Sequence, residues 1–328
     1  MTLARAPAHV VGPDGMPHLG RFEGQALDFG WSRLQRPYRR GGVWRHFHHK
    51  RWHYVALSTA DFFCAVAIVD IGWTNTAFAY AFDRRARKVV AALSRDGLPG
   101  LTAQVGGHAG ADSSFRFLGE RIAVRATGQG EFALELRCRQ FEIDAQYGGD
   151  APLLLAVGEV AGGSVHATQK SSALALSGFL KIGAAHHALD GGVASFDYSN
   201  GLLARRTAWR WASAHGPQVG FNLQAGYFGA NENALWLDGQ LIALGAARFD
   251  FTPDDPLAPW HITTDDGLLD LHFRPEGARR EDKNLLIAAS RYIQPIGTFS
   301  GWVKAAPHAP ARQVTQLVGV TEDHASVW

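Results

Sequence analysis

The stretch "ALWLDGQLIAL", residues Ala234–Leu244, decides the fold class of this sequence. Two short apolar runs flank the pair Asp238-Gly239 at its centre. A type I′ turn requires positive φ at both central residues, and Asp-Gly adopts that conformation at little cost. The stretch therefore predicts a tight β-hairpin.

The same pattern recurs along the chain. In "ITTDDGLLDLHF" (262–273), a second Asp-Gly pair precedes Leu269, Leu271 and Phe273, which alternate with polar residues as on a strand with one wet face. Further strands separated by turn signals are expected within 62–90 and 118–143. Helical periodicity is scarce, so an all-β protein is predicted, with many short strands in each half as in barrels or sandwiches.

The length of 328 residues suits two domains or one large β domain. Glycines cluster in "YGGDAPLLLAVGEVAGGSVHATQK" (147–170), and a new strand pattern begins directly afterwards. We therefore expect one domain over 1–160 and a second over 161–328.

Composition narrows the class of protein. Hydrophobic residues make up 46% and charged residues 19%, and the formal net charge of +2 does not favour a nucleic-acid partner. The N-terminus lacks the apolar core of a secretory signal, and no apolar run reaches about 18 residues, so a cytoplasmic protein is expected. Cys64 and Cys138 are expected to be free thiols.

The central stretch "SFDYSNGLLARRTAWRWASAHG" (195–216) gathers aromatic and charged residues. On a strand, period two places Trp209 and Trp211 on one face, together with Arg205. Asn200-Gly201 reads as a turn, so Asp197 would lie beside the arginines. Two interpretations stay open: core packing with an arginine–Asp197 ion pair, or an aromatic pocket with one acid at its edge.

Further clusters offer weaker candidates. Additional ligand-binding candidates are Asn222, Glu232 and Trp236. The C-terminal "GVTEDHASVW" holds Glu322, Asp323, His324 and Trp328, and could dock into the second domain as a closing strand. A Gly-x-Ser-x-Gly elbow and a phosphate loop are absent from the sequence, and no cofactor is expected.

The segment 33–54 is basic and carries His46, His48, His49 and His53. Read as a strand, it would place His46 and His48 on one face, but companion ligands are not evident nearby, so no metal site is predicted. A basic strand pair against a neighbouring surface is favoured over nucleic-acid binding.

Several strings together resemble a bacterial family known as domain of unknown function 2804: "DYSNGLLARRTAWRWASAHG", "GFNLQAG", "ENALWLDGQL", "DLHFRPEG", "GVTEDHASVW", "KRWHYVALST" and "AFAYAFD". That family is similar in architecture to the two-barrel, lipocalin-like carotenoid 1,2-hydratases and tocopherol cyclases. The resemblance implies two lipocalin-like, calycin-like antiparallel β-barrels. In that group an acid is often followed by a histidine, and "SFDYSNG" matches this string with Asp197 as the acid and Tyr198 in place of the histidine.

Three functions stay open at this point. The first is binding of an apolar isoprenoid or acyl molecule with acid-catalysed hydration, cyclisation or isomerisation, in which Asp197 and Tyr198 are the catalytic candidates. A buried carboxyl group has a raised pKa and can donate a proton, while indole faces stabilise a developing cation. The second is non-catalytic lipid binding or a scaffold role, and the third is a carbohydrate-active protein that uses Asp197 and Glu232.

Overall fold

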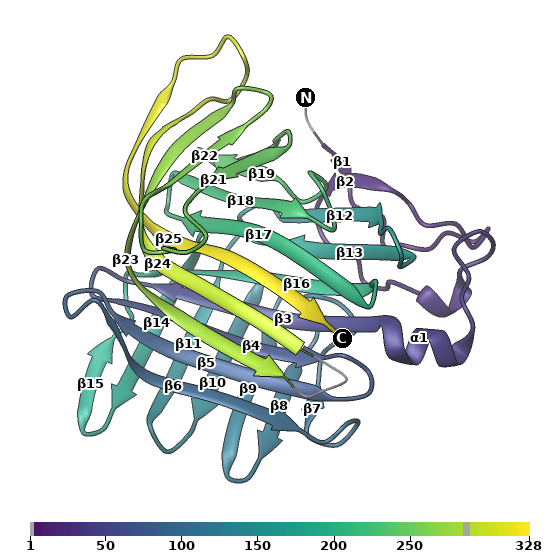
Figure 1. Cartoon of the computed structure of the whole chain (residues 1–328), viewed down its shortest axis with the longest axis horizontal. Helices are drawn as coiled ribbons and strands as arrows, with labels where there is room; N and C mark the ends of the chain where they lie inside the picture. Colours follow the sequence, from purple (N-terminus) through teal and green to yellow (C-terminus); the bar gives the residue numbers. More distant parts are fainter. Residues whose placement is uncertain (1–2, 285–288) are drawn as a thin grey trace.

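The structure is a computed structural model that describes residues 3–284 and 289–328. Its described part is almost entirely β, as predicted, and forms two large sheets that pack against each other (Figure 1). The first sheet contains β1 (Ala4–Arg5), β2 (Gly20–Glu23), β3 (His49–Ser58), β4 (Phe62–Asp70), β5 (Asn75–Asp83), β6 (Lys88–Gly97), β7 (Ala103–Gln104), β8 (Ser113–Phe117), β9 (Glu120–Gly128), β10 (Glu131–Arg137), β11 (Phe141–Gly148), β12 (Leu154–Glu159), β13 (Val165–Lys170), β14 (Leu174–Ile182), β15 (Ala185–Ala188) and β16 (Val193–Leu202).

The second sheet follows the first along the chain. It contains β17 (Arg206–His215), β18 (Val219–Gly226), β19 (Ala234–Leu237), β20 (Gln240–Ala243), β21 (Ala247–Asp250), β22 (Trp260–Thr264), β23 (Leu269–Asn284), β24 (Ala289–Val303) and β25 (Arg312–Val327). The chain thus changes sheet between Leu202 and Arg206, later than the domain break expected near residue 160. That break stays a prediction, but β13, β14 and β16 belong to the first sheet.

The hairpin predictions are confirmed. Asp238 and Gly239 have φ of 49° and 79° and join β19 to β20, as a type I′ turn requires. Leu269, Leu271 and Phe273 are buried on β23, whereas the residues between them are more exposed. Local turn chemistry and period two thus account for much of the second sheet.

Two local predictions are wrong. Asn200-Gly201 is not a turn but lies within β16, where the buried Asn200 side chain accepts a hydrogen bond from the Trp31 indole. The strand expected around His46 and His48 is instead the short helix α1 (Gly42–His48), which follows the 3₁₀ turn Trp31–Arg33. At Asn200, contacts with residues distant in the sequence override the local turn signal.

Each sheet curls around its own apolar core. The two sheets pack against each other through the faces that point away from these cores (Figure 1). Two smaller apolar clusters fill this junction. One is centred on Tyr54, Tyr80 and Trp211, and the other on Phe228 and Trp236. The junction between the sheets, rather than the interior of either sheet, therefore positions the site described below.

Both cysteines are free, with Cys64 buried and Cys138 half-buried. Within the described residues, none of the helices has the length and apolar character needed to cross a membrane.

Candidate functional site

A cavity of about 220 Å³ lies between the two sheets. Side chains from both sheets line it, and most of its wall is aromatic or aliphatic. The aromatic lining residues are Trp52, Tyr54, Trp73, Phe78, Trp209, Trp211, Tyr227, Tyr292 and Trp328. The polar and charged ones are Thr74, Asn75, Thr76, Asp96, Lys170, Asp197, Gln224, Glu232, Arg279, Glu281, Lys283, Ser290, Glu322, His324 and Ser326.

Strand register places these side chains opposite one another on the first sheet. Lys170 on β13 pairs with Asp197 on β16, and Asp197 pairs in turn with Tyr54 on β3. The row continues through Ala67 on β4 to Phe78 on β5. Directly opposite residues share a face of an antiparallel sheet, so one row supplies a charged end and an aromatic end of the same wall.

The second sheet supplies the facing wall by the same device. Trp211 on β17 lies opposite Gln224 on β18 and Glu322 on β25. Two residues away, Trp209 lies opposite His324. The period of two that grouped the tryptophans in the sequence therefore also brings the C-terminal strand into the site.

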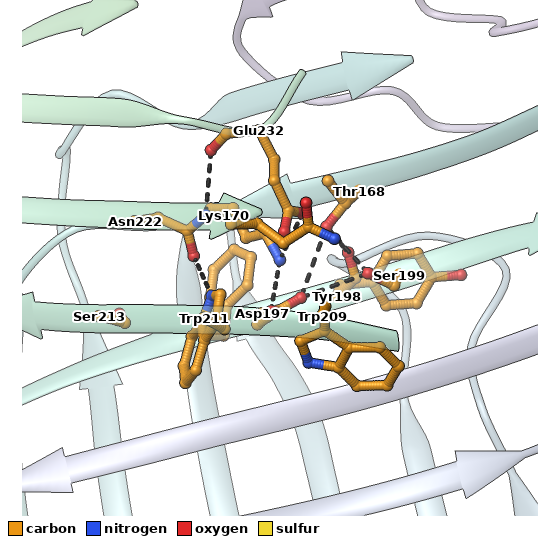
Figure 2. A network of polar contacts seen from close by, with 12 residues as sticks. Thr168, Lys170, Asp197, Tyr198, Ser199, Trp209, Trp211, Ser213, Asn222 and Glu232 are labelled. Atoms are coloured by element: carbon orange, nitrogen blue, oxygen red, sulfur yellow. Dashed lines mark hydrogen bonds and ion pairs between the residues drawn. The ribbon is translucent and has the colours of Figure 1, made fainter. Parts of the chain in front are cut away.

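Three charged side chains form the polar end of the cavity, of which Lys170 and Glu232 are buried and Asp197 is half-buried (Figure 2). The Lys170 ammonium contacts the carboxylates of both Asp197 and Glu232, and the Nζ–Oε2 distance to Glu232 is 3.0 Å. Lys170 and Glu232 are only 2% and 4% exposed. The hydroxyl groups of Thr168 and Ser199 also donate hydrogen bonds to Asp197 Oδ1. Two carboxyl groups therefore share a single ammonium group in a largely solvent-excluded cluster.

The balance of these charges sets the protonation of the cluster. Burial raises the pKa of Glu232, and the nearby Asp197 charge raises it further, against the opposing effect of Lys170. Burial alone would lower the pKa of Lys170, but the two carboxylates keep that pKa above its ordinary value. With one ammonium for two carboxyl groups, Glu232 is the group that most readily carries a proton.

A second polar group centres on Glu322. Its carboxylate accepts hydrogen bonds from the Trp209 indole at 2.8 Å and from Gln294 Nε2 at 3.0 Å. The His324 ring packs against Trp209 with 4.0 Å between ring centroids and a tilt of 51° between the ring planes, and His324 Nδ1 lies 3.3 Å from Glu322 Oε1. These contacts fix the orientation of the Trp209 ring in the cavity wall.

The structure brings together only part of the predicted site. Asp197, Trp209, Trp211 and Glu232 line the cavity. Trp209 and Trp211 point away from the core of the second sheet and face the first sheet across the cavity. The opposite face of β17 carries Ala212, which is fully buried in the core of the second sheet.

Four predicted residues lie outside the cavity lining. The Tyr198 hydroxyl donates to the Gly106 carbonyl oxygen within the core of the first sheet, because adjacent strand residues point to opposite faces. Arg205 donates to the carbonyl oxygen of Trp328. Asn222 accepts a hydrogen bond from the Trp211 indole and so holds that ring from beside the cavity. Trp236 donates to the Pro152 carbonyl oxygen in the sheet junction.

Sequence reasoning missed Lys170, the cation that neutralises Asp197. An arginine that follows Asp197 closely in the sequence was expected to pair with it. Lys170 instead lies on another strand, 27 positions before Asp197. Lys170 stands alone among uncharged residues in "HATQKSS", so the sequence holds no signal that marks it. Only the pairing of β13 with β16 reveals it.

The described residues include one cluster of metal-ligand type. His261, Asp270 and His272 offer ligand atoms within 4.8 Å of one another on β22 and β23, outside the cavity lining. His261 Nε2 and Asp270 Oδ1 already pair at 2.8 Å.

The fold and the cavity together define a class of all-β, lipocalin-like proteins with two curled sheets and an aromatic-walled cavity between them. The chain belongs to the family described as Domain of unknown function (DUF2804), whose model matches residues 15–328.

Solved structures share this fold. One is a protein from Nitrosomonas europaea with the provisional name ATTH, with 12% sequence identity, a TM-score of 0.55, and coverage of 88% of this chain and 96% of that one. Another is kievitone hydratase from Nectria haematococca, with 11% identity, a TM-score of 0.54, and coverage of 89% and 93%. No curated protein matches this sequence significantly.

Proposed function

We propose that this protein binds an apolar small molecule in the cavity between its sheets and transfers a proton to it, as in the hydration of an alkene. The observation that carries the proposal is the buried cluster of Lys170, Asp197 and Glu232 at one end of an aromatic-walled cavity. A hydratase among the proteins of the same fold is consistent with this chemistry.

The proposed reaction uses the charge balance of the cluster. The protonated Glu232 carboxyl donates its proton to one alkene carbon, and the neighbouring carbon becomes cationic. The indole faces of Trp209 and Trp211 stabilise that cation. A water oxygen then bonds to the cationic carbon and loses a proton to a carboxylate of the cluster, which restores the starting state.

A non-catalytic binding protein is the second candidate, and one observation favours it. The contacts of Lys170 to both carboxylates are those of a buried structural ion pair, which needs no turnover to explain it. The carbohydrate-active alternative receives less support. The Lys170 ammonium contacts both acids and takes the space that a sugar would need between them.

The test is a turnover assay with a panel of apolar alkenes, including prenyl-bearing ones, in water labelled with heavy oxygen. Mass spectrometry of ligands that co-purify with the protein would set the panel. The matched variants are Asp197→Asn and Glu232→Gln, each of which keeps the shape and removes an acid. The control is Glu142→Gln, which removes a carboxylate paired with Lys181 at a half-exposed site.

On the catalytic proposal, the two cluster variants lose at least about 100-fold in turnover and retain ligand affinity within a few-fold, while the control is unchanged. Retained turnover in both cluster variants would refute the role of these acids. Tight ligand binding with no labelled product from any alkene would establish the binding protein instead.

A further inference from the structure

Gln224 presents an amide to the cavity that nothing in the described part of the chain satisfies. Its side chain is 1% exposed and lines the cavity, yet neither Nε2 nor Oε1 has a hydrogen-bond partner among the described residues. Its backbone is firmly held, because its amide nitrogen donates to Asn233 Oδ1 at 2.6 Å. Gln224 shares the cavity lining with Lys170 and Glu232.

Another buried glutamine in the same junction shows the contrast. Gln294 Nε2 donates to Glu322, and its Oε1 accepts a hydrogen bond from the Tyr80 hydroxyl. Buried polar groups in proteins are nearly always paired, and an unpaired one is costly to keep. The amide of Gln224 therefore indicates a partner that enters the cavity.

We propose that Gln224 recognises a neutral hydroxyl or carbonyl oxygen on the enclosed end of an otherwise apolar ligand. The inference rests on the proposed function in taking the cavity as the ligand site, and it adds the chemical class of the ligand. An anionic end group is disfavoured, because the cations of the cavity lining, Lys170, Arg279 and Lys283, already contact carboxylates. Those carboxylates would repel an anion.

The cavity also limits the size of the enclosed part. An engineered apolar cavity of about 150 Å³ holds one benzene molecule, so by proportion 220 Å³ encloses roughly nine carbon atoms. The ligand class is thus a mono-oxygenated molecule whose enclosed part is about the size of a bicyclic aromatic or a short isoprenoid.

Two probes that differ only in the polar group test the inference. These are 2-naphthol and 2-methylnaphthalene, which have nearly the same shape, and their affinities are measured by equilibrium dialysis against the full chain. We expect 2-naphthol to bind at least about tenfold more tightly to the wild type. Gln224→Met, which keeps the length and removes the amide, should abolish this preference.

The matched control is Gln169→Met. Gln169 is fully buried and its Nε2 also lacks a partner among the described residues, but it does not line the cavity. It should leave the preference intact. Without ligand, Gln224→Met should have a melting temperature equal to or above that of the wild type, because it removes an unpaired buried amide.

Equal affinity of the wild type for the two probes would overturn the inference, as would a preference that survives in Gln224→Met. A fall in the melting temperature of the ligand-free variant would also overturn it, because the amide would then be structural. Neither probe is turned over, so absence of catalysis leaves this result standing. Failure of both probes to bind would instead remove the cavity as the ligand site and end both proposals.

Discussion

Replacement of Lys170 by methionine should destabilise the protein strongly. Methionine has a similar length and fills the same space, but it leaves Asp197 and Glu232 buried without a counter-charge. Breaking a buried ion pair from one side costs about 3–5 kcal/mol. At about 2.1 cal/mol/K of unfolding entropy per residue, 1 kcal/mol shifts the melting temperature of a 328-residue chain by about 1.5 °C, so the melting temperature should fall by roughly 4–7 °C.

The pH dependence of this loss is the sharper part of the prediction. Burial raises the pKa of Glu232, and without Lys170 the positive charge that opposes this rise is gone, so the folded-state pKa of Glu232 lies further above that of the unfolded chain. Groups of that kind contribute stability below their unfolded pKa and lose it as pH rises through the folded value. The difference in unfolding free energy between variant and wild type should therefore be large at pH 8 and shrink toward pH 4.

Urea unfolding followed by tryptophan fluorescence at pH 8, 6 and 4 measures this difference. Lys181→Met is the control, because Lys181 pairs with Glu142 at a site where both side chains are about one-third exposed. Such a pair contributes about 0–1 kcal/mol. If Lys170→Met is no less stable than Lys181→Met at pH 8, or if its loss is the same at every pH, the buried cluster does not have the charge state described here.

Two further predictions concern single positions. Glu232→Gln should be at least as stable as the wild type at pH 8 and should lose this advantage toward pH 4.5. The raised folded pKa of Glu232 means that its stabilising contribution is present below its ordinary pKa and is lost as pH rises, which urea unfolding across this range would reveal. Gly277→Ala should cost about 1–3 kcal/mol in thermal unfolding, because its Cβ would lie 2.6 Å from the Phe82 ring across the sheet junction. Gly42→Ala has nothing within 4 Å of its added Cβ and should be neutral.

The parts of the fold that depend on neighbouring residues could be predicted. The turn at Asp238-Gly239 needs only two residues that tolerate positive φ, and the alternation after Gly267 needs only a strand with one buried face. The turn predicted at Asn200-Gly201 is wrong because residues distant in the sequence determine the structure there. The Asn200 side chain contacts Trp31 and His49, which are distant in sequence, and these contacts hold β16 as a continuous strand.

The candidate site divides in the same way. Trp209 and Trp211 share the cavity wall because their spacing of two is a local property of the strand. Lys170 was out of reach because β13, β16 and β3 are neighbours in the sheet but not in the sequence. Lys170 reaches the two acids of the site through a strand order that local propensities do not encode.

The pairing of Asp197 with Tyr198 as joint catalytic residues could have been questioned from the sequence itself. Adjacent residues in a strand point to opposite faces, so at most one of them can reach a given cavity. Asp197 reaches the cavity, and Tyr198 anchors the core of the first sheet through its hydrogen bond to Gly106. A partner for Asp197 had to come from a residue directly opposite it on another strand, and Lys170 occupies that position. The charged cluster of this site is thus formed by residues that lie opposite one another on neighbouring strands, and no continuous sequence motif contains it.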